Sequence, residues 1–192
     1  MTEAVNLATL IDRLGRISHA LQFSTGLNPA QWEALRYLAR ANRYSCSPSA
    51  LAKYLGCTKG TVSQTLISLE TKGYVNRVRG EPDGRSVRLE LTEHGRKVLE
   101  QDPLRLIEEA GQALPESERA VVASAMKGLI HALCGKEGMS EFGVCGDCGN
   151  LDTKTPCVKT GKPCTCGLTG EALSEDDLSR ICVDFRPASS SS

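Results

Sequence analysis

The chain has 192 residues, of which 40% are hydrophobic and 4% aromatic, and this apolar share is enough for a globular core. No run approaches the ~20 apolar residues that a membrane-spanning helix needs, and the chain opens on an amphipathic pattern instead of a signal peptide, so we expect a soluble cytoplasmic protein. The net charge is zero, but residues 1–100 hold 14 Lys and Arg against 9 Asp and Glu while residues 101–192 hold 9 against 14, as in a protein that turns one basic part toward nucleic acid.

Two helices are predicted at the start of the chain. The first covers about 20 residues, because apolar side chains recur at helical spacing at Leu7, Leu10, Ile11, Leu14, Ile17 and Leu21. The second begins after Asn28, where an N-cap residue, Pro29 and a capping-box residue, Gln31, follow one another. We expect Trp32, on this second helix, to be buried in the core of the protein.

Residues 50–73 have the pattern of a helix-turn-helix. Leu51, Ala52 and Leu55 repeat at helical spacing, a Gly-Cys turn follows, and a second apolar repeat begins at Val62. With that repeat packed inward, small polar or cationic side chains remain on the open face of the second helix. The residues predicted to contact base edges or flanking phosphates are Lys59, Thr61, Ser63 and Gln64.

A β-hairpin is predicted directly after this helix pair. Residues 74–79 and 86–91 are alternating, β-branched runs on either side of a Gly-Glu-Pro-Asp-Gly-Arg turn. Arg77 and Arg79 lie on the first run and Arg85 follows the turn. We expect Arg77 and Arg79 to contact phosphates, since a cationic hairpin beside a recognition helix can follow the DNA backbone.

These segments resemble the MarR-type winged-helix transcriptional regulators. The resemblance rests on residues 66–70, 72–75, 83–85 and 91–96, and it extends over roughly residues 5–134. It implies that Asp83 braces the wing and that Arg85 enters the minor groove. It also implies a two-fold homodimer, formed by the terminal helices, that binds a pseudo-palindromic duplex.

Two more amphipathic helices are expected after the wing. Thr92 caps the first of them, which has a break or restart at Asp102-Pro103, and Pro115 begins the second, which ends near Gly135. The predicted fold is mainly α with a small β-wing: a winged helix-turn-helix with a helical dimerisation region over residues 1–135.

Residues 136–188 form a predicted cysteine-rich module, followed by a disordered tail at 189–192. Seven of the nine cysteines lie at or beyond position 134, and the module has too few large apolar residues for a core of its own. A short acidic helix capped by Ser174 is expected within it. The predicted metal ligands are Cys145, Cys148, Cys166 and Cys182, with Gly146 and Gly149 giving the turn its freedom and with Cys157 or Cys164 as alternatives to Cys166.

Either Zn²⁺ or an iron-sulfur cluster suits four cysteines. The irregular spacing favours the cluster, because zinc ribbons usually have two paired Cys-x-x-Cys motifs. Loss or oxidation of this centre is expected to unfold the module and to shift the adjacent dimer helices, which end at Cys134.

The sequence therefore predicts a homodimeric transcriptional regulator that binds double-stranded DNA sequence-specifically and acts as a repressor. It is also expected to sense redox state or metal through the cysteine-ligated centre. It is not expected to be an enzyme. One alternative is a small-ligand-responsive MarR-type repressor with a purely structural zinc site. Another is a thiol-disulfide oxidoreductase that uses Cys145 and Cys148, although the chain lacks the βαβ surroundings of such motifs.

Overall fold

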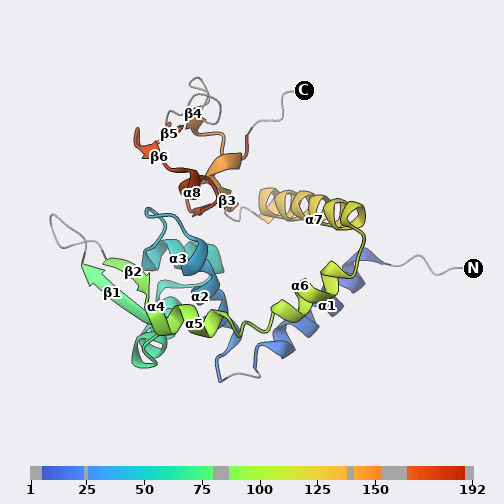
Figure 1. The fold of residues 1–192 in the computed structure, drawn as a ribbon, viewed down its shortest axis with the longest axis horizontal. Helices are drawn as coiled ribbons and strands as arrows, with labels where there is room; N and C mark the ends of the chain where they lie inside the picture. Colours follow the sequence, from blue (N-terminus) through green and yellow to red (C-terminus); the bar gives the residue numbers. More distant parts are fainter. Residues whose placement is uncertain (1–5, 24–25, 80–86, 138–140, 153–163, 189–192) are drawn as a thin grey trace, which may run out of the picture.

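A computed structural model of the chain describes residues 6–23, 26–79, 87–137, 141–152 and 164–188. Three parts are visible in Figure 1: a winged-helix body from α2 to α5, the helices α1, α6 and α7 to one side of it, and the cysteine module above it. The mainly helical fold with a small β-wing is as predicted. None of the helices in the described ranges is both long enough and apolar enough to cross a membrane.

Both predicted N-terminal helices are present, and the second begins where its capping residue predicts. In α1, Leu7–Leu21, the Asn6 side chain accepts a hydrogen bond from the backbone of Ala8. In α2, Pro29–Arg40, Asn28 and Gln31 form a reciprocal capping box, which satisfies two donors of the first turn. Trp32 on α2 is fully buried, as expected.

The helix-turn-helix consists of α3, Pro48–Leu55, and α4, Lys59–Thr71. Ser47 caps α3, and Gly56 ends it in the left-handed region at φ 61°, which a glycine adopts without a steric penalty. The apolar residues predicted to face inward from α4, which are Val62, Leu66 and Leu69, are all buried. This confirms the predicted orientation of the recognition helix.

The wing is an antiparallel pair formed by β1, Val75–Arg79, and β2, Val87–Leu91, with Val75 opposite Leu91 and Arg79 opposite Val87. Its tip, with Asp83 and Arg85, lies outside the described residues. The chain then enters α5, Glu93–Leu99, which Thr92 caps.

Two further helices follow, α6, Arg105–Gln112, and α7, Glu116–Glu137. The end predicted near Gly135 agrees with the structure to within two residues, since α7 is described to Glu137. Large apolar side chains on α1, in and just after α6, and on α7 are exposed: Leu7, Leu10, Leu14, Ile17, Leu106, Leu114, Val121, Val122, Ile130 and Leu133.

The cysteine module is built from short elements. They are β3 Gly143–Val144, the 3₁₀ turn η1 Cys145–Asp147, β4 Leu151–Asp152, β5 Cys164–Cys166, β6 Ala172–Leu173, α8 Glu175–Leu178 and β7 Ile181–Cys182. Strands β4, β5 and β6 form one antiparallel sheet, and β3 pairs with β7. Ser174 caps α8 through a capping box, which confirms the short acidic helix.

The module has more buried contact than its composition suggests. Cys145, Cys164 and Leu173 form a small buried cluster of its own. Ile181 joins the core of the winged-helix body instead, where it is 6% exposed. The shortage of large apolar residues is therefore made up in part by packing against the rest of the chain.

Candidate nucleic-acid interface and cysteine centre

The N-terminal turns of α4 present the predicted DNA-contacting side chains. The Thr58 hydroxyl accepts a hydrogen bond from the backbone of Thr61 at 3.2 Å and caps the helix. Of the four predicted residues on α4, Lys59, Thr61 and Gln64 are exposed and Ser63 is half-buried. The positive end of the helix dipole and a lysine thus lie together on one open surface, an arrangement that suits phosphate oxygens.

The two arginines of the first wing strand differ in their surroundings. The Arg77 guanidinium lies 3.0 Å from the Glu70 carboxylate, so it ties the first wing strand to α4. Arg79 is exposed and lies two residues further along β1, nearer the tip of the wing. Arg79 therefore fits the predicted phosphate contact better, whereas Arg77 has a bracing contact that the sequence did not indicate. The third predicted arginine, Arg85, lies outside the described residues.

The four predicted metal ligands line one small cavity of about 20 Å³. Cys145 and Cys148 come from the turn after β3, Cys166 from β5 and Cys182 from β7, and the other lining residues are Asn150, Leu151, Leu168, Leu173 and Asp184. The fold thus brings together three segments that are far apart in the sequence. In the described part of the chain, however, no three His, Cys, Asp or Glu side chains already surround a single point as a completed metal site would require.

The thiols of Cys145 and Cys182 are in direct contact. Their hydrogen bond lowers the pKa of Cys182 to about 6 and raises the pKa of Cys145 above its ordinary value. The Asn42 amide also donates to the Cys145 sulfur at 3.4 Å. Two sulfurs that share one proton form a donor pair from which a thiophilic cation can displace that proton.

The alternatives for the third ligand are not equivalent. Cys164 is buried and disulfide-bonded, so it offers no thiolate. Cys157 lies outside the described residues. Cys166 lines the cavity with the other three cysteines and remains the better choice.

The glycines of the Cys-x-x-Cys turn have a different role from the predicted one. Among the described residues, the glycines with a positive φ are Gly26, Gly56, Gly73 and Gly170. Gly146 and Gly149 are not among them. A Cβ on Gly149 would lie 2.9 Å from the Pro187 carbonyl oxygen, and one on Gly146 would lie 3.1 Å from that of Leu178. These positions need a small residue because the backbone of a neighbouring segment passes close to them.

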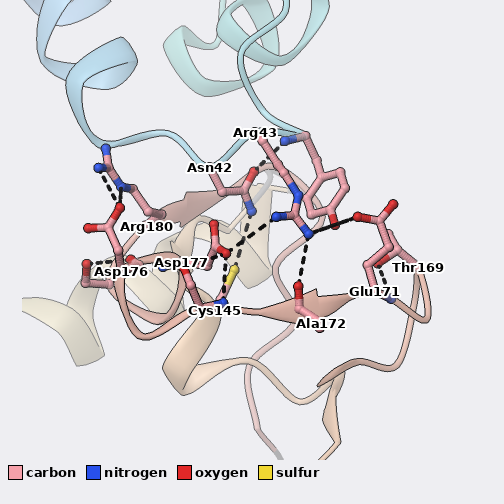
Figure 2. Close-up of polar contacts among 12 residues, drawn as sticks. Asn42, Arg43, Cys145, Thr169, Glu171, Ala172, Asp176, Asp177 and Arg180 are labelled. Atoms are coloured by element: carbon pink, nitrogen blue, oxygen red, sulfur yellow. Dashed lines mark hydrogen bonds and ion pairs between the residues drawn. The ribbon is translucent and has the colours of Figure 1, made fainter. Parts of the chain in front are cut away.

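The sequence did not indicate the residues that join the cysteine module to the winged-helix body. These are in the loop between α2 and α3, chiefly Asn42, Arg43 and Ser45. Figure 2 shows Asn42 and Arg43 beside the module. No local pattern marks them, since a polar loop is equally consistent with plain solvent exposure.

The comparisons with known proteins agree with this geometry. Residues 25–86 match the model of the MarR family. The HTH-type transcriptional repressor YetL of Bacillus subtilis (strain 168) is 31% identical over 96 residues, which are 48% of this chain and 58% of YetL. The match therefore spans little more than half the length of that curated relative.

Two solved structures are similar over most of their own length. The reduced form of MarR from E. coli has 25% sequence identity and a TM-score of 0.52, over 67% of this chain and 98% of that chain. FabT of Streptococcus pneumoniae in complex with DNA has 28% identity and a TM-score of 0.51, over 66% of this chain and 92% of that chain. The family match ends before the cysteine module, and the part of the chain that precedes this module has the fold of the MarR-family winged-helix transcriptional regulators.

Proposed function

We propose that this protein is a transcriptional regulator that binds double-stranded DNA sequence-specifically through α4 and the wing. The observation that carries the proposal is the open face of α4, where Lys59, Thr61 and Gln64 are exposed at a capped helix N-terminus. The wing strand with the exposed Arg79 packs beside the same helix. The similarity to FabT, whose structure was solved with DNA, supports the same assignment.

The protein acts as a homodimer on a pseudo-palindromic site. Support comes from the exposed apolar side chains of α1, α6 and α7. These three helices lie on the side of the molecule away from the wing (Figure 1). Such a surface is costly to leave in water and is typical of an obligate interface. The name of YetL, a repressor, supports repression as the sense of regulation.

A cysteine-ligated centre is the second part of the proposal. Cys145, Cys148, Cys166 and Cys182 would hold it, and their soft sulfur donors suit Zn²⁺ or iron. The irregular spacing of the four cysteines favours an iron-sulfur cluster, whereas Zn²⁺ is the commoner occupant of four-cysteine sites. A bound Zn²⁺ would crosslink the three segments and stabilise the module.

DNA binding is tested by selecting duplexes from a random library with the full-length protein and measuring affinities by fluorescence anisotropy over a range of KCl. Gln64→Ala should cost about 1–3 kcal/mol at one base-pair position and relax the sequence preference there. Arg79→Ala should weaken binding to all duplexes and reduce the salt slope by about 1. Gln101→Ala, at an exposed position after α5, is the control. If Gln64→Ala kept both affinity and preference, α4 would not be the reading element.

The centre is tested by anaerobic purification, quantitation of zinc, iron and sulfide, and an ultraviolet-visible spectrum. One zinc per chain supports the single-ion centre, and iron with sulfide indicates the cluster. A protein that binds neither after reduction refutes the centre. Thiol reductase activity dependent on Cys145 and Cys148 would support the oxidoreductase alternative, and DNA affinity that a small ligand changes but metal does not would support the regulator with a structural zinc.

A further inference from the structure

The loop between α2 and α3, residues 41–46, is the point at which the cysteine module meets the winged-helix body. The backbone N–H of Asn42 donates to the carbonyl of Ile181 at 2.9 Å, and Ala41 forms a parallel bridge with Ile181. On the same edge, the N–H of Val183 donates to the Ser45 hydroxyl at 2.9 Å. The segment that carries Cys182 is therefore held along this loop by backbone hydrogen bonds on both sides of the cysteine.

Asn42 connects the loop to the cysteine cavity itself. It is 3% exposed, and its side-chain N–H donates to the Cys145 sulfur at 3.4 Å. Its side-chain oxygen accepts from the Ser45 hydroxyl at 2.7 Å and from the Tyr44 backbone at 3.1 Å. These contacts fix which way the amide faces, so that its donor points at sulfur (Figure 2).

Charged contacts surround this buried polar network. Arg43 lies 2.9 Å from Glu171 and 3.6 Å from Asp177 of the module, and it donates to the Ala172 carbonyl at 3.0 Å. In the other direction, Arg180 of the module donates to the carbonyl of Ala39 at the end of α2. The module is thus attached to the loop by several independent contacts.

The sequence predicted that a change in the module would act on the dimer helices that end at Cys134. The contacts of the module lie elsewhere. The described contact of the module end with α7 is the ion pair of His131 and Glu141, and Glu141 lies only a few residues after that helix. The contacts with the loop instead lead directly into α3, which packs against α4. A change at the cysteine cavity can therefore reach the recognition helix without passing through the dimer region.

We infer that Asn42 is a positioning residue for the cysteine centre and that residues 41–46 couple metal binding at Cys145 to the placement of α3 and α4 on DNA. The inference rests on the proposed DNA-binding function and on the proposed centre. A donor to a metal-bound sulfur stabilises its negative charge and fixes its direction. Metal bound at Cys145 therefore strengthens the contact that holds the loop in its observed position, and this position favours DNA binding.

Metal and DNA consequently help each other to bind. Because the two sites are linked through one element, each ligand must raise the affinity of the other by the same factor. We expect the metal-loaded protein to bind its selected duplex about 5-fold more tightly or better than the metal-free protein, which is within the usual range of such coupling.

The test uses the full-length protein with Co²⁺ as the probe, because thiolate-bound Co²⁺ has a charge-transfer band that reports on its sulfur ligands. Asn42→Asp keeps the size of the side chain and its acceptor oxygen but replaces the NH₂ group that donates to Cys145. This variant should shift the charge-transfer band to lower energy and should bring the DNA affinities of the loaded and metal-free forms to within about 2-fold of each other.

Tyr44→Phe is the matched control. It removes two exposed hydrogen bonds of the Tyr44 hydroxyl, the one it donates to Glu171 at 2.6 Å and the one it accepts from Arg43 at 2.7 Å, and leaves the sulfur contact intact. The control should keep the wild-type band and the wild-type affinity ratio. A band shift in both variants would mean that loosening the module, and not the Asn42 donor, is responsible, which overturns the assignment of Asn42.

The wild-type protein separates the remaining outcomes. If it binds both Co²⁺ and DNA but with the same DNA affinity in either state, the coupling is wrong while the proposed function stands. If it binds DNA but no Co²⁺, the centre and the coupling both fail. If it binds Co²⁺ but no duplex, the DNA-binding function fails and the coupling with it.

Discussion

Gly95 is a position where the winged-helix body has no room for a side chain. A Cβ there would collide with the backbone oxygen and carbonyl carbon of Tyr74, and it would lie 3.3 Å from the Leu91 side chain. Because backbone atoms cannot move aside cheaply, we expect Gly95→Ala to lower the free energy of unfolding by about 1–3 kcal/mol. Urea unfolding followed by the fluorescence of Trp32, the single tryptophan, measures this.

Gly60→Ala provides the comparison for that prediction. Its Cβ would meet only the Thr58 hydroxyl oxygen, at 3.7 Å, and the residue is exposed in the first turn of α4. Alanine is better than glycine in a helix by roughly 0.5–1 kcal/mol, so this variant should be unchanged or slightly more stable. Equal losses in the two variants would show that the contact with Tyr74 is not what excludes a side chain at Gly95.

Single residues were predictable from the sequence where their role depends on near neighbours. The buried face of α4 and the capping role of Asn28 follow from spacing alone, and the structure confirms both. The grouping of the four cysteines around one cavity also followed, because the residue type limits the chemistry. Asn42 was missed because its partner, Cys145, is 103 positions away and no property of a loop asparagine announces such a contact.

An ion pair connects α2 to the segment between α5 and α6. Arg36 on α2 forms a bidentate pair with Asp102, at 2.6 and 2.7 Å, and also donates to Gln22 just after α1. Both charged side chains are less than one-fifth exposed. We expect Asp102→Asn to cost about 2–4 kcal/mol of unfolding free energy, since it leaves a largely buried guanidinium without its counter-charge. Chemical denaturation measures the loss.

Asp12→Asn is the control for the Asp102 variant. Asp12 pairs with Arg16 at 2.9 Å, but its side chain is 62% exposed, so water replaces the lost interaction. We expect a change within about 0.5 kcal/mol. If Asp102→Asn cost no more than this, the buried pair would not be what fixes the junction between α2 and the segment before α6.

Helices were predictable as elements, whereas the packing between distant elements was not. The start of each of α2, α3, α5 and α8 is marked by a capping residue within a few positions. The attachment of the module to the α2–α3 loop depends instead on contacts between segments well over 100 residues apart, which no local periodicity encodes. The sequence therefore indicated a metal-held module but not the surface on which it lies.

At the scale of the whole molecule, the two halves of opposite charge meet at this loop. The basic half supplies Arg43 and Lys53, which contact Glu171 and the Val183 carbonyl of the acidic half. The remaining basic surface, on α4 and the wing, is left for a polyanion. This arrangement explains how a chain with no net charge can keep a cationic surface, as the proposed DNA binding requires.

If the module and the winged-helix body unfold as one unit, a core substitution in the module should lower the stability of the body as well. Ile181 is 6% exposed and belongs to the core that contains Trp32. Ile181→Ala should therefore lower the free energy of unfolding reported by Trp32 fluorescence by about 2–5 kcal/mol in one cooperative transition. Ile67→Ala, a matched change at a site that is 47% exposed on α4, should have little effect. A Trp32 transition that stays at its wild-type midpoint in Ile181→Ala would mean that the module folds separately, because a side chain that leaves the shared core must destabilise whatever shares it.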